Sequence, residues 1–207
     1  MEEKKLTEKE SLEVITSMIA RTKERYIGSG NVFLLWGYLT VAVAVLIWIL
    51  IAVTRNPACN WLWFLIWIVG GIATPFIAKK QENKSGVKMY TDTLTSRIWT
   101  TVGISSTVCA LMCVGFLFKG IDTWMMMLVF AVIIVPFAEV VQGIVIKEKS
   151  LVVGGAIGLL IGIFTTCCII GRVALNVMWF MPLFIVAFTA MMIVPGHILN
   201  HKAAQKK

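Results

Sequence analysis

The sequence predicts an all-α, polytopic membrane protein with six transmembrane helices, arranged as three helical hairpins, and an N-terminal amphipathic helix. Composition is the first observation behind this fold class. Hydrophobic residues make up 58% of the 207 residues and charged residues only 14%, whereas soluble domains carry about 45–50% and about 25%. The mean hydropathy is +0.86, which also excludes a disordered chain. The second observation is that the apolar residues gather in six long runs, with nearly all charges between them.

Each of the six apolar runs is long enough to cross a membrane as a helix, which takes about 20 mostly apolar residues. The runs cover residues 32–53, 61–78, 98–118, 123–146, 151–170 and 178–198. A transmembrane barrel is not predicted, because barrel strands alternate apolar and polar residues and these runs are apolar on all sides. The chain therefore divides into a leader with a Gly-Ser-Gly hinge (1–30), a six-helix domain (31–202) and a short basic tail (203–207).

The charges between the runs predict the orientation, because Lys and Arg accumulate in cytoplasmic loops. Sixteen of the 19 Lys and Arg residues lie in the leader, the 79–97 loop, the loop after the fourth run and the C-terminal segment. Arg55, Lys119 and Arg172 lie on the other side. Both termini are thus expected in the cytoplasm. The bases are expected to face membrane lipid, and no nucleic-acid partner is predicted.

Landmark residues recur along the chain and predict an internal repeat. Trp36 and Trp99 lie early in the first and third runs, and Trp61 and Trp124 open the second and fourth at the same separation. A proline recurs in the later half of each even run: Pro75, Pro136 and Pro195. We predict three parallel two-helix repeats. The prolines are expected to kink their helices, either around a cytoplasm-facing vestibule or only to allow packing.

The fifth run carries a glycine stripe. Gly154, Gly158 and Gly162 recur at four-residue spacing. Small residues at this spacing let two membrane helices approach closely, so the stripe predicts a packing face. Its partner is either another span or a second copy of the chain in a homo-oligomer.

Four polar residues form a candidate ion or transport site. Glu139 is the one acid well inside an apolar run, and Gln142 shares its helical face; ionisable groups at membrane depth indicate function by default. His197 and His201 lie four residues apart near the end of the sixth run, which places both imidazoles on one helix face. The alternative is that these groups serve packing or the membrane interface. We predict no metal and no cofactor.

The leader is predicted to contain an amphipathic helix over residues 7–26. Thr7 and Glu10 fit a capping box, and Leu12, Ile15 and Ile19 lie on one apolar face. Six acids in the leader argue against simple attraction to anionic lipid. The helix is therefore expected to dock on protein, either the 79–97 loop or a cytoplasmic partner.

Two stretches resemble a group of small, uncharacterised bacterial six-span membrane proteins with an amphipathic leader. They are residues 28–38, at the start of the first run, and 193–202, at the end of the sixth. The resemblance implies a bacterial inner-membrane location. It implies no known activity and supplies no catalytic residues.

The sequence favours a function without catalysis, because it contains no nucleophile elbow, Walker loop or dinucleotide motif. The leading hypothesis is a regulatory or scaffold component that engages a protein partner through the leader and the 79–97 loop. The alternative is a small-solute or ion transporter with a cytoplasm-facing site near Glu139 and His197. A third hypothesis is a metal-dependent membrane enzyme that uses the same residues.

Overall fold

The computed structural model describes residues 30–85 and 90–205, which are almost entirely helical. The helices, in chain order, are α2 (Asn31–Thr54), the 3-10 helix η1 (Pro57–Trp63), α3 (Phe64–Ser85), α4 (Tyr90–Leu117), α5 (Trp124–Val145), α6 (Lys149–Ile170), α7 (Val177–Phe188), the π-helical turn η2 (Thr189–Ile193) and α8 (Val194–Gln205). The amphipathic helix predicted for residues 7–26 lies outside the described residues.

Six helical segments of the described chain are long and apolar enough to cross a membrane, so the protein is a multi-pass membrane protein. They are Asn31–Thr54, Pro57–Lys80, Thr91–Leu117, Trp124–Val145, Lys149–Ile170 and Val177–Gln205. The predicted runs fall on these segments. Most of the predicted 79–97 loop, however, is helical, because α3 continues to Ser85 and α4 already begins at Tyr90. Lys, Gln and Glu are good helix formers, so the helix continues beyond the apolar run.

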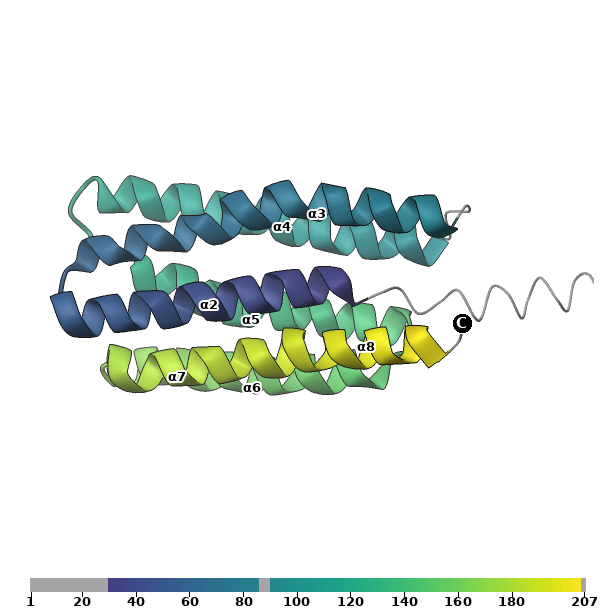
Figure 1. Cartoon of the computed structure of the whole chain (residues 1–207). Coiled ribbons are helices and arrows are strands. Elements are labelled where there is room, and N and C mark those ends of the chain that lie inside the picture. Colours follow the sequence, from purple (N-terminus) through teal and green to yellow (C-terminus); the bar gives the residue numbers. More distant parts are fainter. Residues whose placement is uncertain (1–29, 86–89, 206–207) are drawn as a thin grey trace, which may run out of the picture.

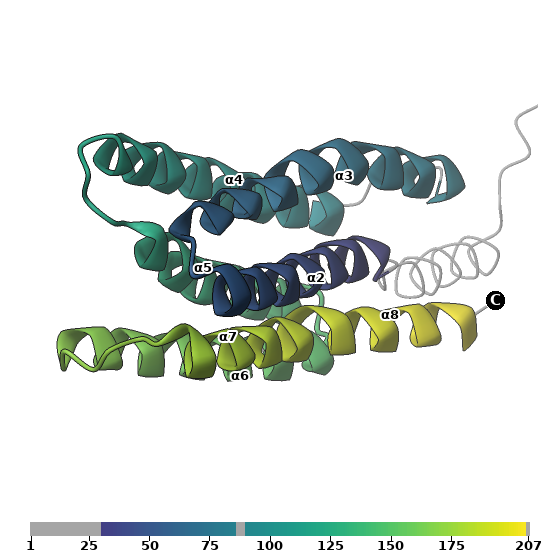
Figure 2. The same ribbon diagram turned by 60° about the vertical axis from the view of Figure 1, so that its left-hand side comes forward.

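The helices lie in three layers (Figure 1). The helices α3 and α4 form one outer layer, α2 and α5 lie in the middle, and α6 and the continuous α7–η2–α8 segment form the other outer layer. Figure 2 shows the same order after rotation. The helices α5 and α6 pack most extensively, while α2 packs against α3, α7, η2 and α8.

Both described ends of the chain lie at one end of the bundle. We call this the basic end, because Lys79, Lys80, Lys147, Lys149 and Lys202 also lie at the helix ends there. The backbone N–H of Gly30 donates to Asn200 Oδ1 at 2.8 Å, and Asn200 Nδ2 donates to Asn31 Oδ1 at 2.8 Å. The start of α2 is thereby fixed beside α8.

The core lies among α2, α5, α6 and the α7–η2–α8 segment. Its largest enclosed apolar side chains include Ile47, Leu151, Phe180 and Phe184. By contrast, only 17% of the residues in the apolar stretch of α3, and 17% in that of α4, are buried. Their outward side chains suit contact with lipid, which is as apolar as they are.

The glycines of α6 lie in the tightest part of this core. A Cβ atom at Gly154 would lie 2.6 Å from the Ala190 carbonyl oxygen of η2, and one at Gly158 would lie 2.8 Å from Pro136 Cβ of α5. Gly162 lies against the backbone of Val132. The structure therefore places the glycine stripe against other spans of the same chain.

The three repeated prolines lie in different surroundings. Pro136 and Pro195 are fully enclosed inside the core, where each contacts a glycine of α6. Pro75 lies inside α3 but is exposed. The three prolines therefore do not surround a common enclosed space in the described structure.

Candidate functional site

Glu139 is the most unusual residue of the core. It lies in the middle helix α5 and has no exposed surface at all. Neither of its carboxyl oxygens has a hydrogen-bond partner among the described residues. Buried polar groups are nearly always hydrogen-bonded, and an unpaired buried charge costs far more than an unpaired neutral group. This site therefore suits a carboxyl group whose charge is neutralised, either by a proton or by a small cation.

The packing of α5 against α6 explains why Glu139 finds no partner. Glu139 follows Pro136 by three residues and precedes Gly143 by four, so all three share one side of the helix. Pro136 contacts Gly155 and Gly158, and Gly143 contacts the start of α6. Glycine brings the backbones together but supplies no polar side chain. Glu139 therefore shares the side of α5 that packs on α6, and its carboxyl oxygens meet no donor among the described residues.

Gln142, predicted as part of the same site, is held by the outer helix α4. Its Oε1 atom accepts a hydrogen bond of 2.7 Å from Trp99 Nε1, and the Trp99 ring contacts Phe33 edge-on at 5.8 Å. Gln142 is 7% exposed. Gln142, one turn from Glu139 on α5, thus has a hydrogen-bond partner. The carboxyl group of Glu139 has none among the described residues.

The two histidines lie apart from this buried position, on the exposed side of α8. His197 Nε2 is 2.7 Å from Tyr38 Oη of α2, and His201 Nε2 is 2.9 Å from Gln205 Nε2. Among the described residues, no group of three His, Cys, Asp or Glu side chains is placed to hold a metal ion. The metal site that would have required Glu139, His197 and His201 together is not assembled in this structure.

The two stretches singled out by resemblance meet at this α2–α8 junction. Besides the bonds from Asn200 and His197, Leu34 packs on Gly196, and Gly37 packs on Met192 and Ile193. The sequence did not reveal that the two stretches contact one another. Their pairing depends on tertiary structure, for which a single sequence carries no local signal.

Glu148, which the sequence analysis did not single out, forms an ion pair with Lys202 at the basic end. Its Oε1 atom accepts hydrogen bonds from Ser150 Oγ at 2.9 Å and from Lys202 Nζ at 2.6 Å. Burial acts to raise the pKa of this carboxyl, but the bonds from Lys202 and Ser150 outweigh it, so the pKa of Glu148 lies below its ordinary value. Its place directly before an apolar helix, with Ser150 two residues later, was the available signal for a helix cap.

Comparison with known proteins gives no match to a family model, a curated protein or a solved structure.

Proposed function

We propose that the protein is a small-solute or ion transporter in which Glu139 binds and releases a proton or a small monovalent cation. The observation that carries this proposal is the carboxyl group of Glu139, fully enclosed and with both oxygens unpartnered. Such a group destabilises a fold unless its charge is neutralised. Unsatisfied groups of this kind are expected where function requires them. Intramembrane acids are typical of ion pathways and proton relays.

The direction of access follows from the position of Glu139 along α5. The helix runs towards the basic end and finishes at Val145, six residues after Glu139. At a rise of about 1.5 Å per residue, this distance is roughly 9 Å. The basic end is thus the nearer surface for an exchanging ion. We place this end in the cytoplasm, on the strength of the bases gathered there, and the resemblance described above implies a bacterial inner membrane.

Flux measurements in vesicles test the transport function. The full chain is reconstituted into proteoliposomes, and proton and Na⁺ movements are recorded with an internal pH dye and a Na⁺ indicator under imposed gradients. We expect a flux of one of the two ions that Glu139→Gln abolishes. The matched control is Asp122→Asn, which removes the acid that precedes α5, outside the membrane-spanning part, and retains flux. The proposal is contradicted if neither proton flux nor Na⁺ flux is detected. It is also contradicted if the Glu139→Gln variant has the same flux as the native chain.

Fusion proteins test the orientation. Green fluorescent protein attached after Lys207 fluoresces if the C-terminus is cytoplasmic, and alkaline phosphatase at the same position stays inactive. The reverse pair of results contradicts the cytoplasmic assignment.

A regulatory or scaffold role is the second candidate function, and the α2–α8 junction favours it. The bond from Gly30 to Asn200 fixes the first described residue of the chain beside α8. The predicted leader helix would then act from a defined place at the basic end. Deletion of residues 1–27 should release cytoplasmic proteins that co-purify with the full chain, while flux through the bundle persists. Retention of every such protein counts against this role.

A further inference from the structure

A shallow apolar groove lies between α6 and the η2–α8 segment, on the outer surface of the bundle. It has a volume of about 230 Å³ and is lined by Ser150, Val153, Gly154, Ile157, Ala190, Val194 and Ile198. Gly154 and Ala190 are the smallest residues of this set, and they lie in direct contact where the two segments meet. Val153 is 58% exposed and Val194 49% exposed. These side chains therefore stand as the walls of the groove.

Each wall of this groove ends in a lysine. On α6, Lys149, Val153 and Ile157 follow one another at four-residue spacing, and on α8, Val194, Ile198 and Lys202 do the same. Residues four apart lie above one another on a helix. The two helices run in opposite directions, so both lysines lie at the basic end. The groove consequently has an apolar body and a cationic mouth.

The mouth retains positive charge after its internal pairing. Lys202 Nζ and Ser150 Oγ bind the same oxygen of Glu148, which places the ammonium group beside the start of the groove. The carboxylate of Glu148 balances the charge of one of the two lysines, Lys149 and Lys202. Lys147, which directly precedes Glu148 in the sequence, adds another positive charge. The side chain of Lys202 is still 42% exposed, and an ammonium group has three donors. Donors therefore remain for an external anion.

We propose that the groove between α6 and α8 binds a phospholipid with an anionic headgroup, its acyl chain along the apolar walls and its phosphate at Lys149 and Lys202. This complementarity of charge and hydropathy matches a lipid lying at the membrane surface, where lysine side chains reach the headgroup level and basic pockets between helices bind anionic headgroups. The site is separate from Glu139 and does not depend on the proposed transport.

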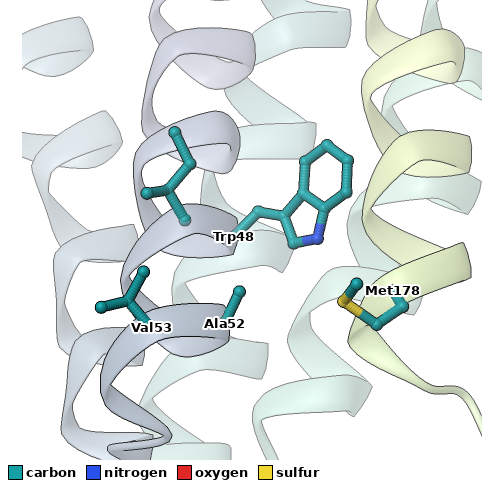
Figure 3. A pocket seen from close by; sticks show the side chains of 5 residues that line it. Trp48, Ala52, Val53 and Met178 are labelled. Carbon is teal, nitrogen blue, oxygen red and sulfur yellow. The ribbon is translucent and has the colours of Figure 1, made fainter.

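A second groove provides the internal control. It lies between α2 and α7 at the opposite end of the bundle and is lined by Trp48, Ile49, Ala52, Val53 and Met178 (Figure 3). Its volume is also about 230 Å³. Arg55, the residue capping α2, is the nearest cation along that wall. This groove has no pair of lysines at the ends of its walls, so we expect no preference for anionic lipid.

Photo-crosslinking with phosphatidylglycerol and phosphatidylcholine probes tests the site. The full chain is placed in nanodiscs containing both lipids, and labelled peptides are identified by mass spectrometry. In the native chain, the labelling ratio of phosphatidylglycerol to phosphatidylcholine on α6 and α8 should exceed the ratio at the second groove by about fivefold. Equal ratios at the two grooves overturn the proposal without requiring any variant.

Variants separate the headgroup from the acyl chain. Lys149→Gln should reduce the ratio at the α6–α8 groove to that of the second groove, and Val153→Trp should reduce labelling there by both probes. Ile49→Trp and Arg55→Gln are the matched changes in the second groove and should leave the α6–α8 ratio unchanged. An unaltered ratio in a Lys149→Gln protein that elutes like the native one also overturns the proposal.

Discussion

The α3–α4 layer of this bundle differs sharply from the other spans in what surrounds its helices. In α5 and in the α7–η2–α8 segment, 39% of the residues of the apolar stretch are buried, against 17% in each of α3 and α4. The glycines differ in the same way: those of α6 lie against atoms of neighbouring helices, whereas Gly103 and Gly115 of α4 have open space around them. Helices that are all apolar enough to cross a membrane therefore have two roles here, that of a close-packed core and that of a lipid-facing layer.

Glu139 belongs to the close-packed spans, and the comparison shows why its position is unusual. A carboxyl group on α3 or α4 would have an exposed face through which lipid headgroups or water are reached. Glu139 instead is fully enclosed, on the side of α5 that carries Pro136 and Gly143 and packs on α6. A closely packed region of the bundle thus carries a carboxyl group, that of Glu139, without a hydrogen-bond partner among the described residues.

The largest expected effect comes from a glycine of α6. Gly158→Leu places a side chain where Pro136 and Met191 already meet the glycine, and we expect the free energy of unfolding to fall by about 3 kcal/mol or more. Thermal denaturation in detergent measures this. The matched variant, Gly115→Leu on α4, meets no atom and should leave the midpoint nearly unchanged. Equal losses in both variants would mean that the two layers do not differ in packing.

Removal of the unsatisfied acid should stabilise the core. Glu139→Leu replaces a carboxyl group without partners by an apolar side chain of similar size. We expect unfolding to become more costly by about 1–3 kcal/mol, together with the loss of ion flux. Thr165→Val is the control, because the buried Thr165 hydroxyl already donates to the Ile161 carbonyl and its removal yields no such gain. A destabilised Glu139→Leu protein would indicate a partner that the carboxyl group needs.

Substitution of the tryptophans that link α2 to α3 and α4 to α5 by hydrogen bonds should have smaller effects on the free energy of unfolding. Trp99→Phe removes the hydrogen bond to Gln142 and should cost about 1 kcal/mol. Trp36→Phe removes the corresponding bond from α2 to Thr74 of α3. Thr74 also donates to Gly70, so the Trp36→Phe cost is expected to be lower. Denaturation midpoints of the two single variants decide the order.

The smallest effect concerns the ion pair at the basic end. Because the pKa of Glu148 is lowered in the folded protein, its contribution is present at neutral pH and is lost as the pH falls below the ordinary carboxyl value of about 4.3 and through the lowered folded value. Lys202 is substantially exposed, so the contribution should stay below about 1 kcal/mol. Midpoints of native and Glu148→Gln proteins should converge on acidification. A constant difference between pH 7 and acidic pH would contradict this.

Hydropathy predicted the six spans because crossing a membrane is a local property of each segment. It failed in the 79–97 segment, where polar helix formers continue α3 past Lys80 and start α4 before Arg97. The hydropathy pattern did identify Glu139 as an acid within an apolar run. That the carboxyl group has no partner could not be predicted, because it depends on which faces of α5 and α6 meet. The repeat of two-helix units stays a prediction; Trp36 and Trp99 do each bind a polar side chain of the following span.

The pairing of α2 with α8 was equally inaccessible to the sequence, whereas the cap of α6 by Glu148 left a signal in the Ser150 that follows two residues later. Asn200 and His197 lie on the exposed side of an apolar run, and their partners come from the start of the first span. A single sequence holds no measure of which distant segments meet. The glycine stripe predicted close approach, and only the structure assigns its partners to α5 and η2.

Infrared difference spectroscopy tests the central claim most directly, namely that Glu139 exchanges its ion with the solvent. The carbonyl band of Glu139 is identified by its loss in the Glu139→Gln variant, in reconstituted full-length protein. We predict that this band shifts after transfer to deuterated buffer, or is replaced by a carboxylate band that responds to Na⁺. The backbone amide groups of the close-packed spans should remain protected from hydrogen exchange under the same conditions. A Glu139 band that responds to neither deuterium nor Na⁺ would contradict the account.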